Sequence, residues 1–108
     1  MMDYRFHPWA ASEYLEAATY YNRCREGLGD VFLEEVEATV KRIRENPDLW
    51  PRLSASVRRS RIRNFPYAMI YTKNETGVLI LAVMHLSRKP GYWKQRLKDP
   101  EFQEFQGQ

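Results

Sequence analysis

The side chains best suited to proton transfer or anion binding lie in the second half of the chain. Residues 52–98 hold eleven Lys/Arg against a single acid, a balance of +10, whereas residues 1–51 hold six against ten. Four arginines fall within Val57–Arg63, His85 ends an apolar run, and the basic aromatic segment 87–97 follows it. This asymmetry indicates an anionic partner for that half. RNA, DNA and an acidic protein are all compatible with it.

The arginines of Val57–Arg63 alternate along a predicted strand. Arg59, Arg61 and Arg63 share one face, because strand side chains alternate with period two. That face is either a solvated edge that discourages edge-to-edge pairing or a binding surface. Ile62 has the opposite parity and should pack inward against the helices.

Two further strands are predicted over Tyr67–Lys73 and Val78–Leu86, joined by a hairpin at residues 74–77. The second of them is apolar on both faces, so both faces must be covered. Strict alternation places Val78, Ile80, Ala82 and Met84 on one face and Leu79, Leu81 and Val83 on the other.

The first half supplies a cover for one face. A short strand over Asp3–His7 precedes a helix from Ala10 to about Glu26, and a second helix begins after Asp30 and ends at Asn46-Pro47. Two helices joined by so few residues form an antiparallel hairpin. The prediction is an α+β fold of order β-α-α-β-β-β, with an antiparallel sheet on a helical hairpin and a short basic, aromatic C-terminal segment. Residues 1–98 form one domain, and 99–108 are a flexible tail or a docking segment.

The composition argues against a membrane protein, a secreted protein and a metalloprotein. No run approaches the roughly 18 apolar residues of a membrane span, and the N-terminus lacks the apolar core of a signal peptide. The single cysteine, Cys24, fits a reducing cytoplasm. His7 and His85 have no cysteine or carboxylate at ligand spacing, so neither a metal nor another cofactor is expected.

Five phrases, in order along the chain, carry a family resemblance. They are HPWAASEYLEAATYY, GLGDVFLEEV, RIRENPDLWP, VRRSRIRNFPYAMIY and ILAVMHLSRKPGYWKQRL. Together they resemble the RelE/ParE toxin superfamily of bacterial type II toxin–antitoxin modules, over about Tyr4–Leu97. The resemblance implies a cytoplasmic toxin neutralised by a small antitoxin encoded beside it. The antitoxin would then cover the second face of the sheet.

The segment from His85 to Trp93 and the Phe65-Pro66-Tyr67 phrase look more like the ParE-like branch. That branch poisons DNA gyrase and needs no catalytic group of its own. The expected target- or partner-binding residues are Arg59, Arg61, Arg63, Arg88, Tyr92, Trp93 and Arg96. Tyr92 and Trp93 could instead close the core.

The alternative is a RelE-like, ribosome-dependent endoribonuclease that cuts mRNA. Such cleavage needs an acid, a base and cations beside the phosphorane. The candidates are His85 as acid or base, Arg59, Arg61 and Arg88 as phosphate clamps, and Tyr92 as a second proton-transfer group. RelE-like chains commonly carry an arginine after the third-strand tyrosine, where this chain has Ala68, so the sequence favours the ParE-like branch. A binding module without toxicity is the third hypothesis.

Overall fold

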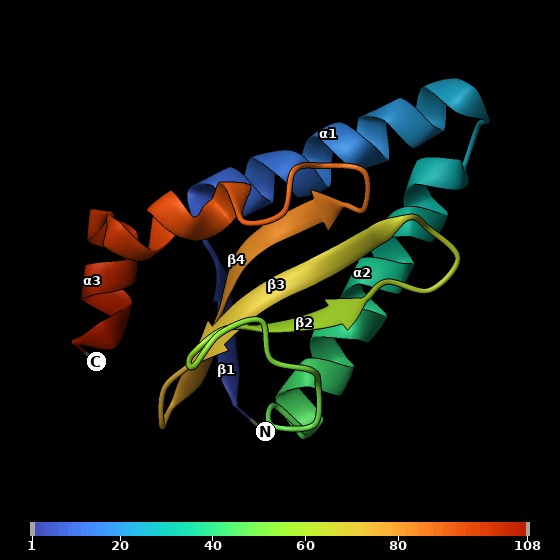
Figure 1. Cartoon of the computed structure of the whole chain (residues 1–108). Helices are drawn as coiled ribbons and strands as arrows, with labels where there is room; N and C mark the ends of the chain where they lie inside the picture. The colour runs from blue at the N-terminus through green and yellow to red at the C-terminus, as the bar shows by residue number, and fades with distance from the viewer. Residues whose placement is uncertain (1, 108) are drawn as a thin grey trace.

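The computed structural model describes residues 2–107, so positions 1 and 108 of the predicted ranges lie outside it. The element order agrees with the predicted α+β fold, with two helical segments added at the C-terminal end (Figure 1). The elements are β1 (Asp3–Phe6), α1 (Pro8–Cys24), α2 (Leu28–Glu45), β2 (Arg58–Arg61), β3 (Tyr67–Lys73), β4 (Gly77–His85), the 3₁₀ helix η1 (Tyr92–Lys98) and α3 (Pro100–Gln106).

The four strands form one sheet in the order β1-β4-β3-β2. β2, β3 and β4 are antiparallel neighbours, as predicted, but β1 pairs with β4 in parallel. The sheet is therefore mixed and not antiparallel throughout. An alternating apolar pattern reports which residues are buried and carries no information on strand direction, so the sequence did not reveal this pairing.

The first helix starts two residues before the predicted Ala10. His7 caps it, with Nδ1 accepting a hydrogen bond from the backbone N–H of Trp9, and Pro8 takes the first helical position, where a missing N–H costs nothing. The turn after α1 uses Gly27 at φ +86°. Gly29 lies inside α2, where a Cβ atom would overlap the backbone oxygen of Ala18. Gly29 thus lets the two helices approach closely.

The helix hairpin covers one face of the sheet and forms the larger core. Phe32 and Phe65 are buried there and their ring centroids lie 5.0 Å apart, with Tyr21 packed against both rings and Tyr67 against Phe32. Ile62 is 1% exposed and belongs to this core, which confirms its predicted inward position.

A β-bulge at Leu81 interrupts the alternation of β4. Tyr71 pairs with Ile80 and Ile70 pairs with Ala82, so Leu81 is an extra residue between two pairs. Leu79, Leu81, Ala82 and Met84 consequently face away from the helices, whereas Val78, Ile80 and Val83 face them. The prediction from strict alternation was right up to Leu81 and wrong for the three residues that follow.

The chain itself covers much of the second face. Trp93 of η1 and Phe105 of α3 are 3% and 4% exposed and pack on the side chains of β4 that face away from the helices. Figure 1 shows this orange-to-red segment returning past the start of α1. The expectation that an antitoxin supplies this cover is therefore wrong for the β4 half of the face. Residues 100–106, predicted as a tail or docking segment, form the short helix α3.

No helix among residues 2–107 is long and apolar enough to cross a membrane.

Candidate functional site

The predicted catalytic residues are divided between the two faces of the sheet. Arg59 pairs with Ile70 and Arg61 with Ala68, and both partners face away from the helices. His85 pairs with Tyr67, which packs against the helix-side core. The bulge at Leu81 reverses the parity of β4 and so places His85 on the helix side. Arg88 lines the same cavity as His85 and lies over the Tyr92 ring, but Arg59 and Arg61 are on the other face of the sheet. The five candidates therefore do not all converge on one site.

His85 is held by its neighbours in the turn after β4. Its Nδ1 accepts a hydrogen bond from the backbone N–H of Ser87 at 3.0 Å, and its ring meets Tyr67 edge-on at 5.0 Å between centroids. It borders a cavity of about 180 Å³ whose lining also includes Glu13, Glu16, Tyr20 and Arg88. Burial, and then the charges of Tyr21, Tyr20 and Glu13, raise the pKa of Tyr67. Tyr67 therefore stays neutral at physiological pH.

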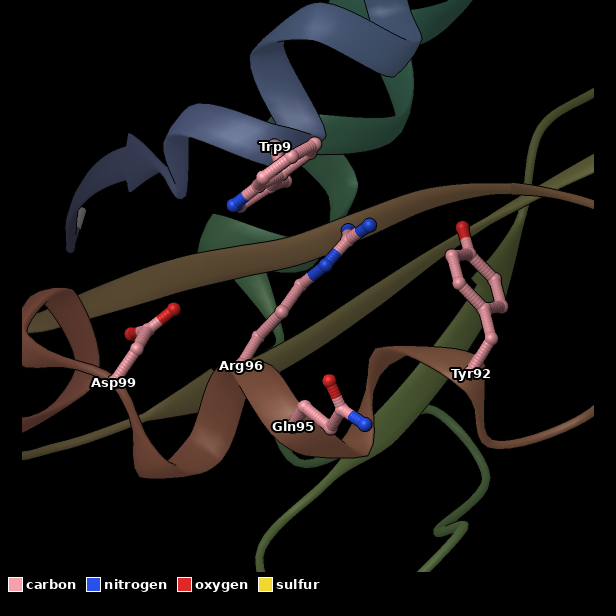
Figure 2. Close-up of a pocket in the computed structure, with 5 residues that line it drawn as sticks. All are labelled: Trp9, Tyr92, Gln95, Arg96 and Asp99. Atoms are coloured by element: carbon pink, nitrogen blue, oxygen red, sulfur yellow. The ribbon is translucent and has the colours of Figure 1, made fainter.

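The carboxylate of Glu13, on α1, binds two of the predicted partner-binding residues, Tyr92 and Arg96. Glu13 accepts hydrogen bonds from the Tyr92 hydroxyl at 2.6 Å and from Arg96 Nη1 and Nη2 at 2.9 and 3.0 Å. Its Oε1 also accepts the backbone N–H of Val83 at 3.0 Å. Figure 2 shows Tyr92 and Arg96 projecting from η1 toward α1, beside a cavity of about 350 Å³. We call Glu13, Tyr92, Arg96 and Val83 the Glu13 network.

This network supplies hydrogen-bond partners for the backbone groups of β4 that β1 does not reach. β1 pairs with β4 only as far as Ile80, and Arg96 Nη1 donates to the Leu81 carbonyl at 2.7 Å, at the bulge. Side chains thus replace a missing strand for Leu81 and Val83. Since a buried backbone group without a partner is costly, the network has a structural role.

The polar groups of Tyr92 and Arg96 are therefore already used in hydrogen bonds within the protein. Burial first, and then the hydrogen bond to Glu13, raise the pKa of Tyr92 above its usual value, against the lowering effect of the nearby arginines. A tyrosine that already donates its proton to a carboxylate is a poor acid for a substrate oxygen. The side chain of Arg96 is 12% exposed and its guanidinium is used by Glu13, so it does not offer a free charge to a partner.

A second contact joins the C-terminal segment to α1. The Nε2 of His7 lies 2.5 Å from Asp99 Oδ2, while Asp99 Oδ1 accepts the backbone N–H of Phe102 and so caps α3. His7 caps α1 in the same way, which means that two helix caps meet across one hydrogen bond.

Arg59, Arg88 and Lys94 line a groove on the face of the sheet that points away from the helix hairpin. The groove has a volume of about 270 Å³ and lies between η1, the loop before β2 and the end of β4. We define the basic groove by Leu53, Arg59, Met84, Leu86, Arg88 and Lys94. Trp93 borders it but is buried, and Arg61 and Arg63 are exposed outside it.

Of the predicted partner-binding residues, Arg59, Arg61, Arg63 and Arg88 are thus available, whereas Trp93 and Arg96 are internal and Tyr92 is half-buried. Sequence reasoning missed Glu13, Lys94 and Leu53. A lone Glu on a helix and a Leu in a loop carry no signal of their own. Lys94 lies in the predicted basic segment 87–97, and nothing in the sequence distinguishes it from the other cations of that segment.

No group of three or more His, Cys, Asp or Glu side chains suited to a metal ion occurs among the described residues.

Comparisons with known proteins agree with this fold. The sequence matches, over residues 4–90, a family model described as the ParE toxin of the type II toxin–antitoxin system parDE. A solved chain from P. aeruginosa, described as a chromosomal ParDE TA system, is similar with a TM-score of 0.58 and 15% identity. The similarity covers 79% of this chain and 96% of that chain, and at this identity it concerns the fold alone. Among curated proteins, no sequence match was found.

Proposed function

Because the chain belongs to the ParE toxin family of type II toxin–antitoxin systems, we propose that it inhibits growth by poisoning DNA gyrase in the cytoplasm and that a cognate antitoxin neutralises it. The observation that carries this proposal is the basic face formed by Arg59 and Arg61 of β2. β2 ends at Arg61, so Arg63, predicted on the same strand face, lies instead in the turn that follows, where it is exposed. Guanidinium groups can bind an anionic target, but because they stay protonated they cannot act as the acid or base of a cleavage reaction.

The same geometry argues against the RelE-like alternative. Cleavage of mRNA requires an acid and a base within hydrogen-bond reach of the reacting oxygens, beside the cations. His85 lies on the helix side of the sheet, and the Tyr92 hydroxyl is bound to Glu13. Arg59 and Arg61 would face a phosphate without either of them.

Expression of the chain without its antitoxin tests the proposal. Growth arrest, together with inhibition of supercoiling by purified gyrase, is the expected result. Ribosome-associated mRNA cleavage with unchanged supercoiling would replace it with the RelE-like mechanism. Normal growth with the protein folded would support the binding module without toxicity.

His85→Gln separates the two mechanisms at a single residue. Gln retains a hydrogen-bond acceptor and a donor, so the turn at Ser87 should persist and toxicity should remain within about twofold of the wild type. A general acid or base contributes typically about 10²–10⁴ in rate, and that effect would be lost. Growth assays with matched expression make the measurement, and loss of toxicity in a folded variant would favour the nuclease.

The proposed antitoxin should complement the charge of the sheet half. Residues 52–98 carry eleven cationic side chains and one acid, so acids opposite Arg59, Arg61 and Arg63 would increase both affinity and association rate. We also expect an amphipathic antitoxin helix with apolar anchors for the helix hairpin. A complex in which the sheet half stays bare would contradict this expectation.

A further inference from the structure

The two outer strands of the sheet differ in what their free edges contact. At β2 the preceding loop occupies the edge, where the N–H of Arg59 donates to the carbonyl of Pro51 at 3.0 Å and Arg52 bridges to Arg58. Three of the four residues of β2 are arginines, so a second β2 strand beside it would set like charges opposite one another. The β2 edge is therefore both covered and repulsive toward a copy of itself.

β1, the strand at the other edge, is open on its outer side. The N–H groups of Asp3 and His7 donate to the carbonyls of Thr76 and Ile80, at 3.3 and 2.8 Å. Because the backbone groups of neighbouring strand residues point to opposite edges, the N–H and C=O of Tyr4 point outward. No backbone group among residues 2–107 bonds to them from outside the sheet, and the Tyr4 side chain is 37% exposed. Such an edge is a template for another strand.

A buried guanidinium on the same strand lacks a partner. The Nε and Nη2 atoms of Arg5 are buried and have no hydrogen-bond partner among residues 2–107. Together these groups make the fork that binds both oxygens of a carboxylate. The guanidinium lies 5.5 Å from the centroid of the Phe105 ring, and Asp3, on the same strand face, forms no ion pair with Arg5. Because buried polar groups are nearly always paired, the Arg5 fork indicates a carboxylate supplied by another molecule.

We propose that two copies of this chain pair along β1, antiparallel and about a two-fold axis at Tyr4. Tyr4 of each copy then exchanges both backbone hydrogen bonds with Tyr4 of the other. Asp3 lies opposite Arg5 of the second copy in a pair that is not hydrogen-bonded, where side chains come closest. The symmetry repeats this carboxylate–guanidinium pair on the same face of the sheet. The two four-stranded sheets become one continuous sheet.

The charges of β1 select this register over its neighbours. An antiparallel partner can shift only in steps that keep Tyr4 opposite a residue whose backbone groups also point outward. With Tyr4 opposite Phe6, Arg5 would face Arg5 of the second copy. With Tyr4 opposite Met2, Asp3 would face Asp3 of the second copy. Like charges directly opposite are destabilising, so the register centred on Tyr4 is the one that the sequence of β1 favours.

The surface of α2 beside β1 extends the contact. A hollow of about 400 Å³ is lined there by Tyr4, Glu37, Lys41 and Arg44, and the guanidinium of Arg44 lies over the Tyr4 ring at 4.9 Å from its centroid. The two-fold axis brings this hollow next to its copy, with an acid and two cations on each side. A stable interface buries roughly 1,200–2,000 Å² in total, more than a four-residue strand supplies alone. We therefore expect a dimer of micromolar affinity, formed by β1 and this part of α2.

Sedimentation equilibrium of the purified chain, without antitoxin and with a thiol reductant, tests the proposal. The reductant excludes a dimer linked through the exposed Cys24. Asp3→Arg should raise the dimer dissociation constant at least about 10-fold, because it sets guanidinium groups against each other in both symmetry-related pairs. Arg5→Asp should do the same with two carboxylates. Asp3→Arg combined with Arg5→Asp should return to within about threefold of the wild type, since the charges are exchanged and again opposite.

The matched control is Glu26→Arg, which makes the same charge change as Asp3→Arg at an exposed position after α1. It should dimerise like the wild type. Thermal melts of all variants confirm that each remains folded, and Asp3→Arg, at an exposed position, carries the test if Arg5→Asp does not fold.

A cross-link locates the axis. In a Cys24→Ser background, Tyr4→Cys places two thiols opposite each other at a Cα separation of about 5.5 Å, within the range of a disulfide. Oxidation with diamide should link most of the protein into a covalent dimer on a non-reducing gel. Glu26→Cys in the same background is the control and should remain largely monomeric.

A wild type that stays monomeric at about 1 mM would overturn the proposal. So would a dimer that none of the β1 variants affects, or a folded double variant that dimerises no better than Asp3→Arg. A monomer that inorganic phosphate stabilises against heat, with the effect lost in Arg5→Asp, would assign the Arg5 fork to a small oxyanion and also overturn it. The inference depends on neither the proposed target nor the antitoxin, so a failure of the growth assay would leave it standing.

Discussion

The Glu13 network and the basic groove both contain cationic side chains, but these are paired in the network and unpaired in the groove. Both involve η1 and β4, and both bring cationic side chains close to apolar surface. In the network, the Arg96 charge is paired with Glu13, and both side chains are largely buried, at 12% and 15% exposure. In the groove, Arg59, Arg88 and Lys94 surround an apolar floor, and no acid among residues 2–107 lines the groove.

This difference in pairing predicts which substitutions should affect the stability of the fold and which should affect binding. Removing one partner of a buried pair leaves an uncompensated charge, which costs about 3–5 kcal/mol. Removing an unpaired cation from the surface changes stability by about 0.5 kcal/mol or less. The network should therefore report on folding and the groove on binding, and the variants below test that division.

The largest effect is expected at Ile62. Ile62→Asp places a carboxylate in the helix-side core without a partner, which should cost more than about 4 kcal/mol and abolish the cooperative thermal transition. Circular dichroism melting makes the measurement. Arg63→Asp, one residue further along and exposed, is the control and should melt like the wild type. A well-folded Ile62→Asp protein would mean that the two faces of β2 are assigned the wrong way round.

Glu13→Ala should cause the second-largest loss of stability. It leaves the Arg96 guanidinium, the Tyr92 hydroxyl and the backbone N–H of Val83 without their acceptor, so the free energy of unfolding should fall by about 3–5 kcal/mol. Urea denaturation measures it. Glu16→Ala, an exposed acid on the same helix, should change stability by about 0.5 kcal/mol or less. Equal effects of the two substitutions would refute the structural role of the network.

Tyr92→Phe removes a single member of the network. The hydroxyl donates to a carboxylate at 2.6 Å, and a hydrogen bond to a charged group contributes about 1.5–3 kcal/mol, so we expect a loss near the lower value because Tyr92 is half-buried. The same denaturation experiment applies. Tyr20→Phe, at an exposed position, should leave the midpoint unchanged. A silent Tyr92→Phe would show that the ring, and not the hydroxyl, holds η1.

Much of the fold was predictable, and the failure at β4 has a definite cause. The order of elements, the helix hairpin and the inward position of Ile62 follow from apolar periodicity and turn residues. The bulge at Leu81 does not, because the segment from Val78 to Met84 is apolar throughout and contains no glycine to mark an irregularity. One extra residue then places His85 on the helix side, away from Arg59 and Arg61.

The Glu13 network was beyond sequence reasoning for a different reason. Glu13 and Arg96 are separated by 83 positions, and either residue alone resembles an ordinary surface charge. Their meeting depends on where η1 docks, which is set by burial of Trp93 and Phe105. The available arginines of β2 were predictable, since period-two alternation alone places them on one face. Which cations remain unpaired could be read only from the structure.

Arg59→Glu combined with Arg61→Glu tests the central claim most directly, because it reverses the basic face without touching either core. Growth on expression without the antitoxin is the measurement, with a thermal melt of the same protein. We predict normal growth and a melting temperature within a few degrees of the wild type, since this face makes no ion pair within residues 2–107. A folded double variant that still arrests growth would contradict the assignment of function to this face.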